Sequence, residues 1–243
     1  LTDVTTNAYT LTVNGATASA ATLALLRAKT TEDIKVDAKE ITGSFAEVEG
    51  VYVTNAGDYT GLGNKNVKIT GTVTTGTDDI DAILDVTTGI VTATLTSGSA
   101  SALIADTENA SAKDALTLTV TGPATAEDLL TLDGRTSVTV NASAVTAVTG
   151  SAAELKQLLA SKGVSLAKGV DINISDVVVK AADVNAIAKA TSGLVTATVE
   201  AGTAAALNKA LTDKDVNALT LTVNGTTAAA ADLVALDAKT SVS

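Results

Sequence analysis

The chain contains no cysteine and no histidine, and these two absences remove most of the usual catalytic chemistry. Without cysteine there is no disulfide framework, no thiolate nucleophile and no soft metal ligand. Without histidine, a serine or cysteine nucleophile lacks its usual general base. Only carboxylates, hydroxyls, lysines and hard metal ions remain, so we expect the protein not to be an enzyme.

Tryptophan and methionine are also absent, and aromatic residues make up only 2% of the 243 residues. A compact enzyme of this size commonly uses aromatic side chains to fill an irregular core. Hydrophobic residues nevertheless reach 46%, almost all of them alanine, valine, leucine and isoleucine, which favours a thin core built from uniform layers. Because even position 1 is not methionine, we expect an internal or processed piece of a longer polypeptide.

Positive charge is scarce as well. The chain carries 16 basic and 27 acidic residues, a net charge of −11, and its only arginines are Arg27 and Arg135. Nucleic acids and anionic membranes are bound through clusters of lysine and arginine. The sequence also lacks an apolar run long enough to span a bilayer. We therefore expect no nucleic-acid partner and no insertion into membranes.

The residues that are present form an internal repeat. Thr10–Gly15 recurs as Thr117–Gly122 and as Thr220–Gly225, at offsets of 107 and 103 residues. Gly89–Leu95 returns as Gly193–Val199, an offset of 104 residues. Collinear matches at one offset indicate slightly more than two copies of a repeat of about 104 residues. We expect one array over 1–243, divided into a first superrepeat at 1–115, a second at 116–218 and the start of a third at 219–243.

Each superrepeat is expected to hold four units of strand, turn and helix. Leu116–Val120 alternates apolar and polar residues as strands do, whereas Leu155, Leu158 and Leu159 have helical spacing. A hydroxyl three residues before a carboxylate, as in Ser151–Glu154, is typical of a helix start. The same pattern opens the helices expected after Ser44 and Thr125. Strands are expected at 9–14, 34–38, 67–73, 90–95, 116–121, 138–142, 170–175, 194–199 and 219–224.

The spacing of these units predicts an α/β fold, specifically a parallel α/β solenoid. Successive strands are mostly twenty-odd residues apart, which is typical of repeats that stack on their neighbours. We expect a parallel sheet on one side and a layer of short helices on the other. This plan is similar to that of leucine-rich repeats, although the leucine-rich consensus is absent.

Threonines alternate with apolar residues along the expected strands. In Leu116–Val120 the leucines and the valine are expected to point inward, and Thr117 and Thr119 outward. The same pattern recurs in other strands, giving the candidate binding residues Thr10, Thr12, Thr92, Thr94, Thr117, Thr119, Thr196, Thr198, Thr220 and Thr222. Strands about 4.8 Å apart would align these hydroxyls into ladders, as ice-binding β-solenoids do. Lys35 and Lys68 interrupt that face, however, and threonine also simply suits exposed strand positions.

The densest acidic cluster offers a candidate metal site. Asp78, Asp81 and Asp85 are helical neighbours, three and four residues apart, and could converge on Ca²⁺. The alternative is a negatively charged first turn, favoured by the helix dipole, together with a solvated helix face. The corresponding part of the second superrepeat keeps only Asp183, so the cluster does not recur. We expect no cofactor other than calcium.

The few aromatic residues lie in the first 60 positions. Phe45, Tyr52 and Tyr59 are seven residues apart, within an enlarged unit. They either fill extra volume there or, in the case of Tyr52 and Tyr59, provide a local stacking surface for a glycan or another partner.

The style of the repeat resembles that of a known group of proteins. Leu221–Gly225, an alanine-rich helix and Asp237–Val242 follow one another. This succession resembles repeats of very large secreted or cell-surface bacterial proteins, which are often described as adhesin-like or calcium-binding. The resemblance implies export and a structural or adhesive role in an extracellular filament or layer. The alternative is a module that binds ice, glycan or mineral through the threonine face.

The two ends of a solenoid expose its core unless a polar cap covers them. Neither Leu1 nor the segment ending at Ser243 resembles such a cap, and Ser241–Ser243 aligns with the strand start at Ser137. We therefore expect end-to-end self-association, or continuation into further repeats.

Overall fold

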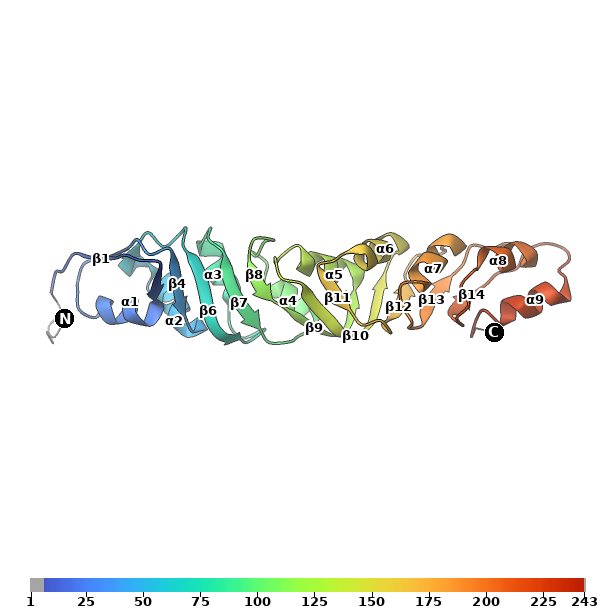
Figure 1. Cartoon of the computed structure of the whole chain (residues 1–243), viewed down its shortest axis with the longest axis horizontal. Helices are drawn as coiled ribbons and strands as arrows, with labels where there is room; N and C mark the ends of the chain where they lie inside the picture. Colours follow the sequence, from blue (N-terminus) through green and yellow to red (C-terminus); the bar gives the residue numbers. More distant parts are fainter. Residues whose placement is uncertain (1–6, 243) are drawn as a thin grey trace. The chain divides into compact units, whose positions relative to one another are not determined.

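The computed structural model describes residues 7–242 and has an α/β architecture with parallel sheets and alternating strands and helices (Figure 1). The α/β prediction is therefore confirmed. Contacts within the chain define two compact units. Unit 1 holds the residues up to Thr119 together with Leu132–Val140, and unit 2 holds Val120–Thr131 and the residues from Asn141 onward. The expected strand entry at Ser243 and the uncapped end at Leu1 lie outside the described residues.

Unit 1 contains two parallel sheets. The smaller sheet has the order β1-β3-β5, with bounds β1 (Leu11–Val13), β3 (Ile34–Val36) and β5 (Tyr59–Thr60). The larger sheet has the order β2-β4-β6-β7-β8, with bounds β2 (Thr17–Ser19), β4 (Glu40–Gly43), β6 (Asn66–Val73), β7 (Val91–Leu95) and β8 (Ala115–Thr117). Neighbouring strands follow one another along the chain, as β4, β6 and β7 do in Figure 1.

The prediction of one sheet with one strand per unit was wrong for the start of the chain. The strands expected at 9–14 and 34–38 belong to the smaller sheet, whereas 67–73 belongs to the larger one. The chain turns a corner between β1 and β2, which belong to different sheets, and Gly15 in this turn has a φ of 125° that residues with side chains disfavour. A strand of three or four residues is too short to show an alternating pattern in the sequence.

The helices of unit 1 are short and begin at hydroxyl or carboxylate caps. Ser44 and Glu47 form the expected capping box, and Ser19, Asp79 and Ser99 each accept a backbone N–H at a helix start. Their bounds are α1 (Ala20–Arg27), α2 (Phe45–Glu49), α3 (Ile80–Val86) and α4 (Ala100–Ala105). Helix α2 continues into a π-helical turn, η1 (Gly50–Thr54), and a 3₁₀ turn, η2 (Ala56–Asp58).

Unit 2 is built around a single six-stranded sheet of order β11-β10-β12-β13-β14, in which β9 also pairs with β10. The strands are β9 (Thr119–Thr125), β10 (Val140–Gly150), β11 (Val164–Leu166), β12 (Asp171–Ile174), β13 (Val195–Thr198) and β14 (Ala218–Thr220). The helices are α6 (Ala152–Ala160), α7 (Ala181–Ala188), α8 (Ala204–Ala210) and α9 (Ala230–Asp237). Helix α5 (Ala126–Asp133) contributes residues to both units.

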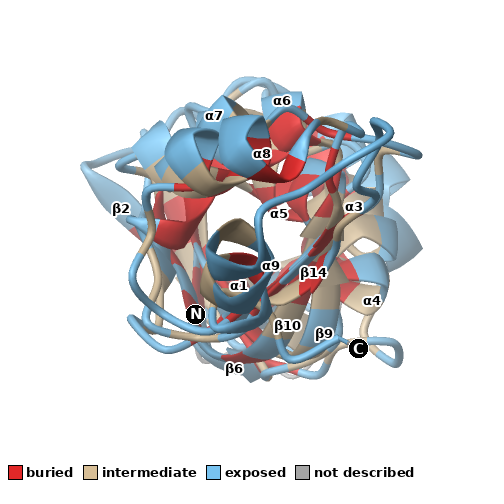
Figure 2. Cartoon of the chain, turned by 90° about the vertical axis from the view of Figure 1, so that its right-hand side faces the viewer, coloured by how far each residue is buried: buried red, intermediate tan, exposed pale blue. Residues whose placement is uncertain are grey.

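The core consists of aliphatic side chains from the inward positions of strands and helices. Val91, Ala93 and Leu95 of β7 are buried, and Leu155 and Leu158 of α6 are buried at their helical spacing. In Figure 2 the outward sides of α7 and α8 are exposed. The inference of a thin, layered aliphatic core is consistent with these positions.

Candidate functional site

The threonine faces were the first candidate site, and in unit 1 they form one short hydroxyl row. Thr72 of β6 lies opposite Thr94 of β7, and Thr94 lies opposite Thr117 of β8. All three residues are exposed. Strands in a sheet are about 4.8 Å apart, so these hydroxyls are spaced at roughly that distance. Thr92, the other candidate in β7, lies between Lys68 and Ala115 and is half-buried.

In unit 2 the row is shorter. Thr198 of β13 lies opposite Thr220 of β14, but Thr196 lies between Asn173 and Ala218. Thr196 and Thr220 are exposed, and Thr198 is half-buried. A pair of hydroxyls is too small to present the flat, repeated array that a crystalline surface requires.

The remaining threonine candidates lie apart from these rows. Thr12 belongs to the smaller sheet of unit 1, opposite Lys35, which forms an ion pair of 2.9 Å with Asp37. Thr10 precedes β1, and Thr222 follows β14. Thr119 opens β9, and its backbone carbonyl accepts the Gly98 N–H. The ten candidate threonines therefore do not lie on one continuous face, because β1 and β3 belong to a separate sheet.

A second group of threonines, absent from the sequence-based candidates, follows every odd-numbered helix. Each side-chain hydroxyl donates to a carbonyl oxygen 20–22 residues earlier, at 2.6–2.7 Å. Each also accepts the backbone N–H two residues later, at 2.9–3.1 Å. We call these residues threonine bridges: Thr30, Thr87, Thr136, Thr191 and Thr240.

Thr136 shows the bridge most completely. Its hydroxyl donates to the Leu116 carbonyl at 2.7 Å and accepts N–H groups from Leu116 and Val138, each at 3.0 Å. Thr136 is 5% exposed, so water does not compensate these backbone groups if the hydroxyl is lost. The bridge therefore holds the turn after a helix against the preceding strand.

The residue after a bridge also carries a hydroxyl, and at Ser137 and Ser192 this hydroxyl adds a second contact between the turn and the earlier segment. The backbone N–H of Ser137 donates to the Asp114 carbonyl at 2.7 Å, and its hydroxyl donates to the same oxygen at 2.9 Å. Ser192 contacts the Lys168 carbonyl in the same way, at 2.7 and 3.2 Å. A hydroxyl pair just after a helix, seen again in Thr87-Thr88 and Thr240-Ser241, was the sequence signal that could have revealed these junctions.

Asparagine and aspartate side chains at strand starts form another recurring contact. Each accepts a backbone N–H from an adjacent strand or its entry, at 2.8–3.0 Å. These residues are Asn66, Asp114, Asp171 and Asn217. Asp114 and Asn217 are 2% and 3% exposed, so they are among the few buried polar side chains of the described chain. Their polar atoms are used within the fold and do not point toward a ligand.

The acidic candidates for calcium are also bonded within the chain. Asp78 accepts the Thr74 N–H at 2.7 Å, and Asp81 accepts the backbone and side-chain N–H groups of Asn109, each at 2.6 Å. Asp85 is exposed at the end of α3. Within residues 7–242, no three acidic side chains converge on a position that could hold a metal ion. Calcium binding stays a prediction, which calorimetric titration with calcium chloride tests.

Two shallow polar hollows lie beside α3 and α7, next to the loops that contain Asn109 and Thr212. On α7, Asn185 accepts the Thr212 N–H at 3.0 Å and donates to the Ala210 carbonyl at 2.8 Å, in the place that Asp81 takes on α3. The hollow beside α7 has a volume of about 420 Å³, and the one beside α3 about 280 Å³. Each is open and lined by charges of both signs, including Lys189 and Asp213 in the larger one, so neither arrangement suits one particular ligand.

The aromatic candidates lie in the interior of unit 1. Tyr52 in η1 and Tyr59 in β5 are 3% and 7% exposed, so neither ring presents a face on which a sugar could stack. Burial raises the pKa of Tyr52 far above its usual range, and its hydroxyl has no hydrogen-bond partner among residues 7–242. Burial, and then the charge of Asp58, raise the pKa of Tyr59. The stacking-surface interpretation is therefore corrected, because both rings fill volume in the core.

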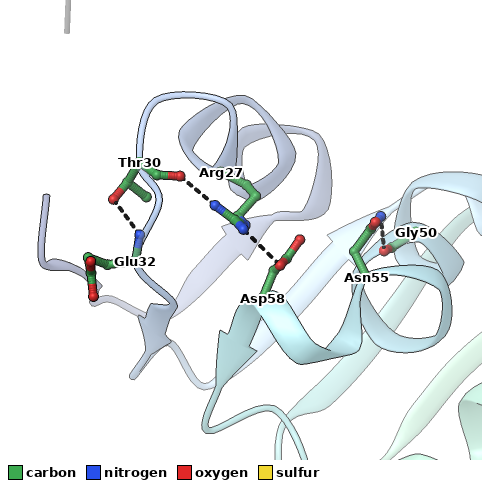
Figure 3. Close-up of polar contacts among 6 residues, drawn as sticks. All are labelled: Arg27, Thr30, Glu32, Gly50, Asn55 and Asp58. Carbon is green, nitrogen blue, oxygen red and sulfur yellow. Dashed lines mark hydrogen bonds and ion pairs between the residues drawn. The ribbon is translucent and has the colours of Figure 1, made fainter. Parts of the chain in front are cut away.

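Arg27 ties α1 to the segment beside these tyrosines (Figure 3). Its guanidinium donates to Asp58 at 2.9 Å and to the carbonyl of the bridge residue Thr30. The hydrogen bond to Asp58 raises the pKa of Arg27, so the guanidinium stays charged. Asn55 donates to the Gly50 carbonyl at 2.8 Å across η1. The polar contacts of Figure 3 thus secure the ends of short elements.

No protein-family model, no curated protein and no solved structure matches the chain. Among the described residues, no helix has the length and apolar character needed to cross a bilayer. The geometry is therefore the main basis for assigning a function.

Proposed function

We propose that the chain is a structural or adhesive repeat segment of an extracellular or cell-surface protein. In this proposal each strand–turn–helix repeat is one coil of a parallel α/β solenoid, and the coils are grouped into superrepeats of about 104 residues. In unit 1 the strands of each parallel sheet lie side by side in chain order, and in unit 2 β12, β13 and β14 do the same, which supports stacked coils. Export, and a place in a filament or layer, come from the resemblance to bacterial surface repeats.

The observation that carries the proposal is the use of polar side chains within the fold. The threonine bridges recur after α1, α3, α5, α7 and α9, and each links a turn to a strand segment 20–22 residues earlier. An enzyme or receptor site instead needs polar groups that converge in a concave pocket. A chain that uses its buried hydroxyls and carboxamides to join successive elements is suited to transmitting force or to spacing other domains.

The row of Thr72, Thr94 and Thr117 favours one alternative function, a module that binds ice, a glycan or a mineral surface. These hydroxyls are exposed, lie in register and carry no charge between them. The row is only three strands wide, and Lys68 lies in β6 close to it. Surface binding through this row would require that other copies extend it.

Thermal-hysteresis and glycan-array measurements on the wild type distinguish the two functions. The structural proposal predicts no thermal hysteresis and no glycan signal. The test variants are Thr94→Lys for unit 1 and Thr196→Lys with Thr198→Lys for unit 2, and Val177→Lys is the control because its side chain is 90% exposed and it belongs to neither row. A signal that disappears in the threonine variants but persists in the control would replace the structural proposal with the binding one.

A further inference from the structure

Helix α4 of unit 1 has a loop bound along it. The loop Thr74–Asp79 connects β6 to α3. The Thr75 N–H donates to the Thr96 hydroxyl at 2.9 Å, and the Thr75 hydroxyl donates to the Thr96 carbonyl at 2.8 Å. The Gly76 N–H donates to Asp106, the C-cap of α4, at 2.9 Å. The loop therefore contacts both the turn that enters α4 and the end of that helix.

Unit 2 repeats this turn and helix but not the loop. At the repeat offset of 104 residues, Glu200 takes the place of Thr96, and α8 takes the place of α4. The N–H of Thr96 donates to the Val73 carbonyl at 2.9 Å. The N–H of Glu200 donates to the Val179 carbonyl at the same distance, so Val179 is the equivalent of Val73. Six residues follow Val73 before α3 begins, whereas Lys180 alone separates Val179 from α7.

Helices α7 and α8 are neighbours in Figure 1, and an open groove of about 360 Å³ lies between them, where unit 2 lacks the loop. Small apolar side chains line most of this α7–α8 groove, including Ala181 of α7 and Ala206 of α8. Three other lining residues are the repeat equivalents of those that the loop contacts in unit 1: Glu200, Gly202 and Ala210, in place of Thr96, Gly98 and Asp106. The groove is therefore the unit 2 counterpart of the place that the loop fills.

The two equivalent glycines show the difference between the units. A Cβ atom added to Gly98 would lie 3.3 Å from the methyl group of Thr75, which covers this glycine. At Gly202 the nearest atoms all belong to Leu207 of α8. In unit 2, therefore, nothing from the segment before α7 takes the place of the Thr75 methyl group.

Glu200 offers two hydrogen-bond acceptors in the groove. The residue is exposed, and within the described chain no group donates to its carbonyl or to its carboxylate. In unit 1 the carbonyl and the hydroxyl of Thr96 hold Thr75 from the same place. A carboxylate accepts a backbone N–H more strongly than a hydroxyl does, because it carries charge. The groove thus has acceptors at both positions that hold Thr75 and lacks only that of Asp106, since Ala210 occupies its place.

We propose that the α7–α8 groove binds a short peptide segment of another protein in which a glycine follows a threonine. The threonine donates its N–H to the Glu200 carboxylate and its hydroxyl to the Glu200 carbonyl, as Thr75 donates to Thr96 in unit 1. Glycine suits the next position because Gly76 has a φ of 75°, which residues with side chains disfavour. This inference goes beyond the proposed function and uses none of the ten candidate threonines.

Titration of the isotope-labelled chain, followed by nuclear magnetic resonance, tests this binding with a synthetic peptide of the sequence Val73–Asp79, blocked at both ends. The amide signals of Gly202 and Leu207 should shift in a saturable manner. Ala206→Trp places an indole ring in the groove and should lower the affinity by about tenfold or more. Ala205→Trp is the matched control, because Ala205 is also exposed on α8 but does not line the groove. Since both alanines are exposed, circular dichroism should show unchanged folding.

Two further changes test the individual contacts. Ala210→Asp recreates the acceptor that Asp106 provides in unit 1, and should raise the affinity by about threefold or more. A peptide with valine in place of Thr75 lacks the hydroxyl that the Glu200 carbonyl accepts, and should bind about fivefold more weakly.

The absence of saturable shifts would overturn the inference, and so would shifts confined to residues outside the groove. Equal losses of affinity in the two tryptophan variants, or an Ala206→Trp variant that binds as the wild type does, would also overturn it. A chain that binds no such peptide would still serve as a structural repeat. This outcome is therefore distinct from the ligand signal that replaces the proposed function.

Discussion

Threonine hydroxyls occupy two different environments in this chain. The bridge hydroxyl of Thr136 contacts several buried backbone groups, whereas Thr196 on the sheet face is exposed and lies opposite Asn173 and Ala218. Loss of a buried hydrogen-bonding group leaves its partners unsatisfied, but loss of an exposed one lets water replace it. The two kinds of threonine should therefore respond differently to the same substitution.

Thr136→Val should lower the free energy of unfolding by about 2 kcal/mol or more, because the Leu116 and Val138 N–H groups lose their acceptor. Thr136→Ser keeps the hydroxyl and should cost about half as much or less. Thr196→Val should change stability by no more than about 0.5 kcal/mol. Urea denaturation followed by circular dichroism measures all three, and equal losses at both positions would contradict the distinction.

Tyr52 offers a second residue-level test, because its buried hydroxyl has no partner in the described chain. Tyr52→Phe should raise the free energy of unfolding by about 1 kcal/mol at neutral pH, since it removes a desolvated polar group. Tyr9→Phe is the matched control, because the Tyr9 hydroxyl accepts a hydrogen bond from Asn7 at 3.2 Å. A loss of stability in Tyr52→Phe would mean that the hydroxyl is paired.

The pH dependence of the same variant follows from the raised pKa of Tyr52. The folded chain keeps the phenol proton above pH 10, whereas the unfolded chain releases it near its usual pKa of about 10. Ionisation of Tyr52 therefore leaves the free energy of unfolding unchanged below about pH 10. Above that pH it lowers the free energy of unfolding of the wild type by up to about 1.4 kcal/mol per pH unit. The difference in stability between wild type and Tyr52→Phe should therefore widen between about pH 10 and 12, as urea titrations at each pH can measure.

At the scale of elements, equivalent strand starts carry different polar side chains that accept a hydrogen bond from the same place in the neighbouring strand. Asp114 accepts N–H groups from Val91 and Ser111, both at 2.9 Å, so a carboxylate fits. At the equivalent place, Asn217 accepts the Val195 N–H at 3.0 Å and donates to Asp213 at 2.7 Å, so an amide fits. The loop beside each strand therefore determines which of the two side chains is suitable.

The pairing of Asn217 with Asp213 predicts that one substitution lowers stability and that a second one restores it. Asn217→Asp places a second carboxylate against Asp213, and should lower the free energy of unfolding at pH 7 by about 2 kcal/mol or more. Adding Asp213→Asn restores a donor opposite the new carboxylate and should recover most of that loss. Thermal denaturation of the single and double variants measures both effects. A double variant less stable than Asn217→Asp alone would show that the pair does not couple in this way.

The elements also show how far the sequence could predict the fold. The helix caps at Ser44 and Ser151, and the buried leucines of α6, were foreseeable because hydroxyl–carboxylate spacing and leucine periodicity are local patterns. The short strands β2 (Thr-Ala-Ser) and β4 (Glu-Ile-Thr-Gly) were not, because three or four residues with at most one large apolar side chain carry no clear alternation. The corner between β1 and β2 decided which threonines share a sheet.

The candidate site was less predictable than the fold, because it depends on contacts between residues that are far apart in the sequence. Outward-facing threonines can be recognised within one strand, but whether they align depends on register between strands, which the sequence does not state. The bridges join residues 20–22 positions apart, so their importance becomes clear only when the turn after each odd-numbered helix is placed against a strand segment. The repeated hydroxyl pair was visible in the sequence but is also a common feature of surface turns.

At the scale of the whole molecule, most element contacts join segments that are close together along the chain. Contacts within the chain define unit 1 and unit 2, and each bridge connects a turn to a residue 20 or 21 positions earlier, as at Thr136 and Thr191. In the proposed repeat array, stability is approximately a sum of local terms and interfaces between neighbouring coils. A local substitution should then have a local effect, unlike in a single cooperative globular domain.

Native-state hydrogen exchange, read by mass spectrometry of peptides, tests this central claim most directly. Thr136→Val should increase exchange in peptides covering β7, β8 and the residues around Thr136, and leave β12 and β13 protected. Thr191→Val, which removes the bridge to Val170 in unit 2, should give the reciprocal pattern. Confined, reciprocal losses are the result that the repeat-array account predicts. Uniform loss of protection across both units in either variant would contradict it.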